Sequence, residues 1–332
     1  MWLIWIVFIV LILGLLALDL GVFHRKSHVV SVREALAWTA VWMALGFAFT
    51  GVVYYLFEHH WGGSGTSLNP QYPHDGKTAA QMYLAGYLLE KSLSIDNIFV
   101  IALIFSYFRV PQIHQHRVLY WGILGALIMR GVMIGIGTEM VKHFWWMTIV
   151  FGVLLIVTAI KLLFHSDENV DPEHNLLVRL ARRIYPTTSE YDGAKFFTQH
   201  NGKRVITPMF LCLLVIESTD LIFAVDSIPA VIGITHDPFL VFTSNVFAIL
   251  GLRSLYFALA GMMDKFRYLK YSLVVLLLFI GVKMLIEFKV HITVSESLGI
   301  IAVVLAIGIG ASMLASRRGQ TPNGSTPNGS AT

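Results

Sequence analysis

Residues 217–229 read Glu217-Ser-Thr-Asp-Leu-Ile-Phe-Ala-Val-Asp-Ser-Ile-Pro229 and place three carboxylates inside a long apolar run. A run of this length is sufficient to cross a bilayer. An acid at the centre of a membrane helix costs roughly 2.5–3.5 kcal/mol, so these acids need partners, protons or a cation. The stretch therefore predicts a membrane helix that carries a polar functional site.

The composition of the whole chain agrees with a membrane protein. Of its 332 residues, 56% are hydrophobic and only 13% are charged, against about a quarter in soluble domains. The net charge of +4 is weak evidence for nucleic-acid binding, since the basic residues lie between apolar runs, and we expect no nucleic-acid partner. Cys212 is the only cysteine, which excludes a disulfide within the chain and a thiolate-rich site for soft metals.

Apolar runs long enough to span a bilayer predict an all-α polytopic membrane protein with about nine transmembrane helices. The first run lacks a basic segment before it and a small-residue cleavage site, so we expect it to remain as a span. The runs lie at about 2–22, 35–57, 81–108, 118–137, 144–164, 207–233, 239–262, 271–288 and 297–315.

Basic residues cluster in every second connection between these runs. By the positive-inside rule this places the N-terminus outside and the C-terminus in the cytoplasm. We predict a transmembrane domain over residues 1–316, which includes a cytoplasmic loop over 165–206. Residues 317–332 contain Thr-Pro-Asn-Gly-Ser twice, and we predict that this low-complexity tail is disordered.

Two parts of the chain resemble each other. Ser94-Ile-Asp-Asn-Ile-Phe99 matches Ser218-Thr-Asp-Leu-Ile-Phe223, and a nearly constant offset also relates Arg130 to Arg253 and Lys161 to Lys283. We therefore predict two three-helix repeats, about 81–164 and 207–288. Because each repeat has three spans, the second is inverted in the membrane, a pattern typical of transporters with broken helices near the midplane.

Polar side chains of the two repeats form the candidate metal site between the third and sixth runs. Inversion of the second repeat puts Asp96 and Asp220 at one depth, with the other acids about 4.5 to 9 Å away at 1.5 Å per residue. Oxygen ligands of high negative charge, without paired His or Cys, favour a hard divalent ion such as Mn²⁺, Mg²⁺ or Ca²⁺. The candidate ligands are Glu90, Asp96, Asn97, Glu217, Asp220 and Asp226.

Arg130 and Arg253 are the expected charge partners of these acids. In one alternative the acids only neutralise buried basic residues, but two well-buried arginines cannot balance five acids.

Pro229 predicts a helix break, because it cannot donate to the carbonyl of Val225 and clashes with it, so the helix should kink beside Asp226. In the other interpretation, Pro229 only closes the helix near the outer surface.

Four stretches of the chain carry a likeness to a known family: residues 17–24, 90–100, 217–231 and 243–253. They make the chain similar to the TerC family of integral membrane proteins, and most of all to its Alx-type members. The resemblance implies a bacterial inner-membrane protein that exports manganese. It also implies that the acids Asp96, Glu217, Asp220 and Asp226, with the amide of Asn97, are functional residues within the membrane.

We therefore predict a secondary transporter, not an enzyme, that exports Mn²⁺ across the bacterial inner membrane. We expect no tightly bound cofactor, with Mn²⁺ as the transported substrate and membrane lipid as the other partner. No nucleotide-binding motif of the Walker type is present, so ATP is not the direct driver. The open alternatives are an exporter of Ca²⁺ or Na⁺, coupled to protons, and a non-transporting factor that assists membrane-protein assembly. The oligomeric state is left open.

Overall fold

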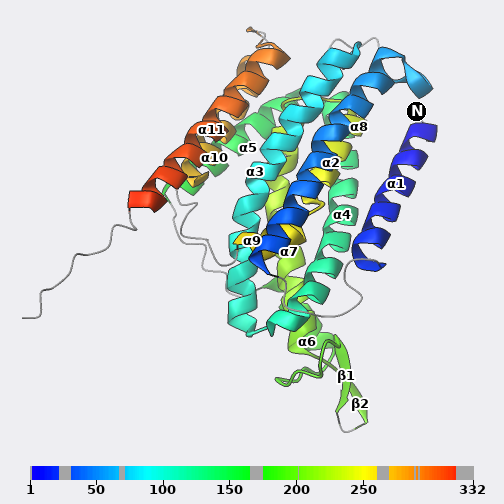
Figure 1. Cartoon of the computed structure of the whole chain (residues 1–332), viewed down its shortest axis with the longest axis vertical. Helices are drawn as coiled ribbons and strands as arrows, with labels where there is room; N and C mark the ends of the chain where they lie inside the picture. The colour runs from blue at the N-terminus through cyan, green and yellow to red at the C-terminus, as the bar shows by residue number, and fades with distance from the viewer. Residues whose placement is uncertain are drawn as a thin grey trace, which may run out of the picture.

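The computed structural model describes residues 2–21, 31–66, 72–164, 175–200, 202–259, 269–287, 289–290 and 292–318. The long helices run side by side along the long axis of the molecule (Figure 1). A short helix and a two-stranded hairpin lie beyond one end, which we call the hairpin end. The predicted disordered tail lies, but for residues 317 and 318, outside the described residues.

The described helices begin and end as follows: α1 (Trp2–Gly21), α2 (Val32–Glu58), α3 (Gly76–Phe108), α4 (Gln112–His143), α5 (Trp146–Phe164), α6 (Leu176–Ile184), α7 (Pro208–Ile232), α8 (Pro238–Ile249), α9 (Leu252–Leu259), α10 (Leu269–Ile286) and α11 (Val294–Arg318), with one short 3₁₀ turn at Trp61–Gly63. Strands β1 (Phe197–His200) and β2 (Lys203–Ile206) pair antiparallel.

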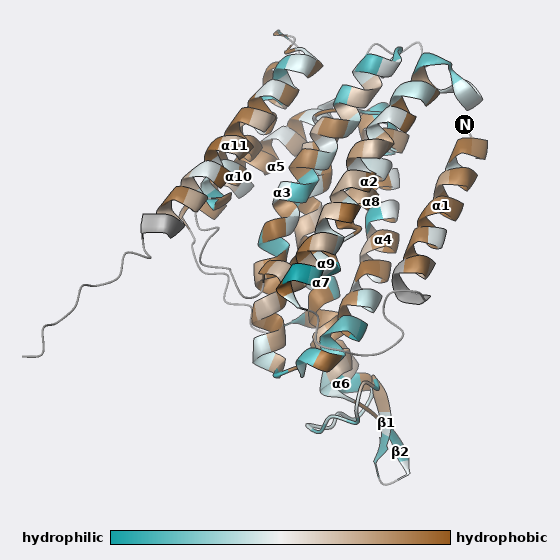
Figure 2. Cartoon of the chain, viewed as in Figure 1, coloured by the Kyte–Doolittle hydropathy of each residue, from teal (hydrophilic) through white to brown (hydrophobic). Residues whose placement is uncertain are grey.

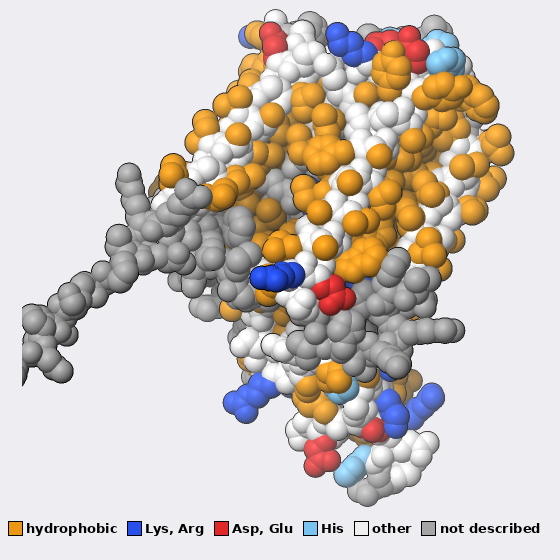
Figure 3. Space-filling model, viewed as in Figure 1, with side chains coloured by type: hydrophobic (Ala, Val, Ile, Leu, Met, Phe, Trp, Pro, Cys, Tyr) orange, Lys and Arg blue, Asp and Glu red, His pale blue; other side chains and the backbone are white. Residues whose placement is uncertain are grey.

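Within the described residues, seven helical segments are long and apolar enough to cross a membrane: α2, α4, α5, α7, α8 with α9, α10 and α11. This confirms a polytopic helical membrane protein. Of the two remaining predicted spans, α1 contains a shorter apolar stretch, Trp2–Leu18, and α3 is a 33-residue helix that lies among the others. Hydrophobic residues cover the long helices and their outer surface (Figures 2 and 3), as contact with lipid requires.

Helix α3 is the central helix and packs against α2, α7, α8 and α11. Its N-terminus is capped by Asp75, whose side chain accepts a hydrogen bond from the backbone N–H of Thr78. At its other end Arg109 adopts the left-handed conformation, with φ of 53°, and ends the helix. The buried face of α3 includes the charged Glu90 and Lys91, so the centre of the bundle is polar.

An aromatic cluster joins α1, α2 and α8. Phe49 of α2 packs on Phe247 of α8 with ring centroids 4.6 Å apart, and Phe8 of α1 lies 5.6 Å from Phe49 and 5.8 Å from Phe239. Such ring pairs contribute about 0.5–1.5 kcal/mol each beyond the area that they bury. The cluster therefore fixes α1, which is otherwise largely exposed, against the bundle.

Helices α5 and α10 cross at a pair of glycines. A Cβ atom placed on Gly152 would lie 3.0 Å from the carbonyl oxygen of Gly281, and one placed on Gly281 would lie 2.8 Å from the carbonyl oxygen of Gly152. No side chain fits between the two backbones at this point. Small residues permit such close helix crossings in membranes.

Helix α7 is continuous through Pro229 and ends three residues later at Ile232. The kink beside Asp226 stays a prediction, since proline can bend a helix without ending it. A break is present in the next span, between α8 and α9, where Gly251 has a φ of +82°. The ammonium group of Lys91 donates to the carbonyl oxygen of Ala248 at 3.1 Å, so a cation stabilises the carbonyl end of α8.

We predict that Gly251→Ala destabilises the protein. A Cβ atom at this position would lie 2.6 Å from the Cβ atom of Trp42, and the positive φ disfavours any side chain. The expected loss is about 1–3 kcal/mol, measured as a lower thermal unfolding midpoint in detergent. Gly135→Ala in α4 is the matched control, since a Cβ there meets nothing within 4 Å. Equal midpoints for the two variants would contradict the prediction.

Candidate functional site

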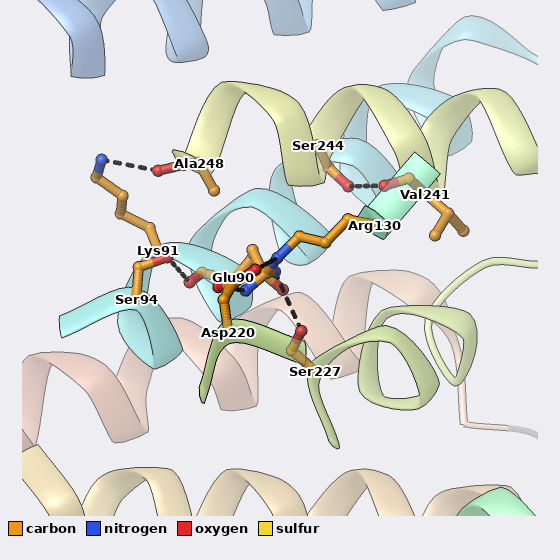
Figure 4. Close-up of polar contacts among 9 residues, drawn as sticks. All are labelled: Glu90, Lys91, Ser94, Arg130, Asp220, Ser227, Val241, Ser244 and Ala248. Carbon is orange, nitrogen blue, oxygen red and sulfur yellow. Dashed lines mark hydrogen bonds and ion pairs between the residues drawn. The ribbon is translucent and has the colours of Figure 1, made fainter. Parts of the chain in front are cut away.

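A buried ion-pair cluster lies where α3, α4 and α7 meet (Figure 4). Arg130 of α4 binds Asp220 of α7 through two nitrogens on one edge of its guanidinium, with Nη2–Oδ1 at 2.8 Å and Nε–Oδ2 at 3.1 Å. Its Nη1 contacts a carboxylate oxygen of Glu90 on α3 and donates to the hydroxyl of Ser227 at 3.3 Å. The side chain of Arg130 is 2% exposed and that of Glu90 is fully buried.

One guanidinium is thus shared by two carboxylates. This leaves one formal negative charge among the three side chains, and the second oxygen of Glu90 has no hydrogen-bond partner. A bidentate contact between arginine and a carboxylate is a strong and geometrically specific pair. Arg130, which the sequence predicts as a charge partner, therefore lies between two of the candidate metal ligands. The other expected partner, Arg253, is buried at the start of α9.

A cavity of about 310 Å³ lies between α3, α5, α7 and α10. Asp96 enters it from α3 and Asp226 from α7. The Thr158 hydroxyl of α5 donates to a carboxylate oxygen of Asp226 at 2.7 Å, which fixes the orientation of that acid. The polar residues that line this cavity are Asp96, Asn97, Thr158, Lys161, Asp226 and Ser227.

A smaller cavity, of about 30 Å³, lies on the other side of α3 and α7, next to Arg130 and Asp220. Asn97 and Phe223 line both cavities, and Ser227 lines the larger one while it binds Arg130. The ion-pair cluster and the larger cavity are therefore neighbours, separated by these side chains.

Glu217 occupies a third position, against α4. A Cβ atom on Gly125 would overlap the Glu217 carboxylate, so only glycine leaves room for this acid. One oxygen of Glu217 is buried without a hydrogen-bond partner. Since Glu217 lies one turn before Asp220 on α7, it is the acid of this helix nearest the hairpin end.

The structure separates the acids that the sequence places in one site. Asp220 faces α4, whereas Asp226 faces α5, because six residues along a helix turn a side chain by about 120°. In the part of the chain that the structure describes, no three His, Cys, Asp or Glu side chains lie together as a metal site. A cation in the larger cavity would therefore need oxygens of Asn97, Thr158 or Ser227 beside the two acids.

Thr158 was not among the predicted site residues. It is one of two threonines in the apolar run 144–164, and hydroxyl residues in such runs usually bond their own helix backbone. Its spacing of three residues from Lys161, on the same face of the helix, is the one signal that could have drawn attention to it. Lys161 itself lines the cavity with the acids.

Known proteins resemble this chain over most of its length. The model of the family described as "Integral membrane protein TerC family" matches residues 75–320. A Myxococcus xanthus protein named "Uncharacterized membrane protein STKORF319" is 46% identical over 317 residues, which cover 96% of this chain and 94% of the relative. An Escherichia coli K12 protein named "Putative membrane-bound redox modulator Alx" is 41% identical over 307 residues, 92% of each chain. No solved structure matches.

We predict that Arg130→Met strongly destabilises the protein. The substitution leaves the Glu90 and Asp220 carboxylates buried without their cation, which typically costs about 3–5 kcal/mol. Thermal unfolding in detergent measures the loss. The triple variant with Glu90→Gln and Asp220→Asn removes the stranded charges and should recover most of the stability. If Arg130→Met alone were as stable as the parent, the ion-pair cluster would not hold the three helices together.

Proposed function

The chain belongs to the TerC family of integral membrane proteins, and we propose that it is a secondary transporter that exports Mn²⁺ across the bacterial inner membrane. One observation carries the proposal. The 310 Å³ cavity brings Asp96 and Asp226, from two helices that lie side by side, together with the oxygens of Asn97, Thr158 and Ser227.

The chemistry of this cavity suits a hard cation. Two carboxylates and several neutral oxygens, without His or Cys in the lining, are the ligand set that Mn²⁺, Mg²⁺ and Ca²⁺ prefer. The cavity volume corresponds to about ten waters at roughly 30 Å³ each, so an ion could enter with part of its hydration shell. Lys161 at the same cavity offers a positive charge that competes with the ion and favours its release.

The acids outside this cavity take other roles in the proposal. Glu90 and Asp220 are bound to Arg130 and hold α3 and α7 in register. Glu217 lies against α4, nine residues and thus about 180° around α7 from Asp226, so it is outside the cavity. The transport path in this proposal runs through the cavity, with Asp96 and Asp226 as its central ligands.

The packing of the helices supports two inverted repeats as part of this proposal. Helix α3 packs on α8 as α7 packs on α4, and the third helices of the two repeats, α5 and α10, pack on each other. Each contact has a counterpart, as a pseudo-twofold axis in the membrane plane requires. The repeats differ in one respect, since α4 is continuous whereas its counterpart is divided into α8 and α9.

Three other functions are weighed against manganese export. The name of the Escherichia coli relative refers to redox modulation. The one thiol of this chain, on Cys212, is buried, which gives no support to thiol exchange. A transporter of Ca²⁺ or Na⁺ would use the same ligands, and an assembly factor would use none of them. Total metal content of cells with and without the protein distinguishes these, because only an exporter of Mn²⁺ lowers manganese specifically.

We predict that Asp96→Asn and Asp226→Asn each reduce Mn²⁺ transport in proteoliposomes. Each change removes one charged ligand, and loss of about 1.5–3 kcal/mol of ion binding corresponds to roughly a tenfold to hundredfold effect. Asp192→Asn is the control, because Asp192 is exposed in the segment before β1 and should leave transport unchanged.

The outcomes of this experiment test the location of the site and the identity of the transported ion independently. Unchanged Mn²⁺ transport in both cavity variants would exclude the cavity as the path. Transport of Ca²⁺ or Na⁺ by the parent, with loss in the same variants and no Mn²⁺ transport, would keep the cavity and replace the ion. No transport of any metal by the parent would favour the assembly factor.

A further inference from the structure

Helix α6 is amphipathic, and part of its apolar side is uncovered in the described structure. Leu176, Leu180 and Ile184 are 75%, 51% and 63% exposed, and their spacing of four residues places them along one side of the helix. Val178, on a different side, is 1% exposed, and α6 packs against α7. The helix therefore uses one side to join the bundle and leaves a row of three large apolar side chains outside.

The remaining side of α6 is basic. Arg179, Arg182 and Arg183 are exposed, and α6 itself contains no acidic residue. On a helical wheel the three arginines occupy a sector of about 100° next to the apolar row. The exposed surface of α6 thus combines an apolar strip, formed by Leu176, Leu180 and Ile184, with a basic strip, formed by the three arginines.

The cap of α6 fixes this surface relative to the bundle. The side-chain oxygen of Asn175 accepts hydrogen bonds from the N–H groups of Leu177 and Val178, and its amide nitrogen donates to the hydroxyl of Ser218 on α7 at 2.5 Å. The helix cannot turn about its axis without breaking these contacts. The apolar and basic strips therefore keep a constant direction.

Helix α6 lies at the edge of the hydrophobic surface of the bundle. The helix lies at the hairpin end, just beyond the long helices (Figure 1). Lys and Arg side chains appear on both sides of this end, below the hydrophobic surface of the bundle (Figure 3). In a bilayer this is the level at which acyl chains give way to headgroups.

We propose that α6 is an interfacial helix that binds anionic phospholipid. Leu176, Leu180 and Ile184 enter the upper acyl region, while the three arginines contact headgroup phosphates. Amphipathic helices with a basic face bind membrane surfaces in this way, and anionic lipid adds to the attraction for each basic residue. A second copy of the chain would cover the apolar strip but would not supply anions to the arginines. The acidic segment 165–174, outside the described residues, is the other candidate occupant.

A lipid-quenching experiment on the full-length protein tests this proposal. Leu180→Cys provides a labelling site for an environment-sensitive fluorophore, because the native thiol of Cys212 is buried. The labelled protein is placed in nanodiscs that contain either brominated phosphatidylglycerol or brominated phosphatidylcholine at the same mole fraction. Lys203→Cys, exposed on the hairpin, is the control label. A variant with Arg179→Gln, Arg182→Gln and Arg183→Gln in the Leu180→Cys background tests the role of charge.

We expect the label at position 180 to be quenched about threefold more by the anionic lipid than by the zwitterionic one. The preference should disappear in the variant without the arginines, and the hairpin label should be quenched by neither lipid. Absence of quenching at position 180 by both lipids would overturn the proposal and would mean that protein or water covers the helix. Equal quenching by the two lipids would overturn the assignment of an anionic headgroup.

Discussion

The buried guanidinium of Arg130 constrains the whole bundle. Apolar side chains do not by themselves select a neighbouring helix in a membrane, because lipid tails satisfy them as well as protein does. A buried arginine has no such freedom, since it must meet its counter-charges where they are. Its two acids come from α3 and α7 while it stands on α4. The ion pairs therefore determine which three helices meet and at what depth.

The main features of the fold follow from local sequence, whereas its irregularities do not. Apolar runs and their lengths predict where the helices lie, and turn residues such as Asp75 and Asp237 cap α3 and α8. Pro229 looks like the stronger helix breaker, yet α7 continues past it. The helix is interrupted at Gly251 instead, although the apolar run continues through this position. The close approach of the backbone to Trp42 there requires a residue without a side chain. Only tertiary packing contains that information.

For the candidate site, too, the sequence predicts some features, and the others depend on how the helices pack. Acids at membrane depth are costly enough to stand out in the sequence, so their importance could be predicted. Their spacing along α7 also predicts that Asp220 and Asp226 point in different directions. It does not say that α4 faces the first and α5 the second, nor that Arg130 binds two acids at once. Thr158 enters the site only because α5 packs beside α7.

The glycine crossing is the point about which α5 would rotate against α10. The two backbones touch there, and the side chains of Ile156 and Leu285 flank the contact. Thr158 lies six residues from Gly152, a lever arm of about 9 Å along α5. A swivel of about 10° would therefore displace it by roughly 1.5 Å, comparable to the difference between a bound and a released oxygen ligand. Rotation of α5 about this crossing would therefore open or close the contact between Thr158 and Asp226.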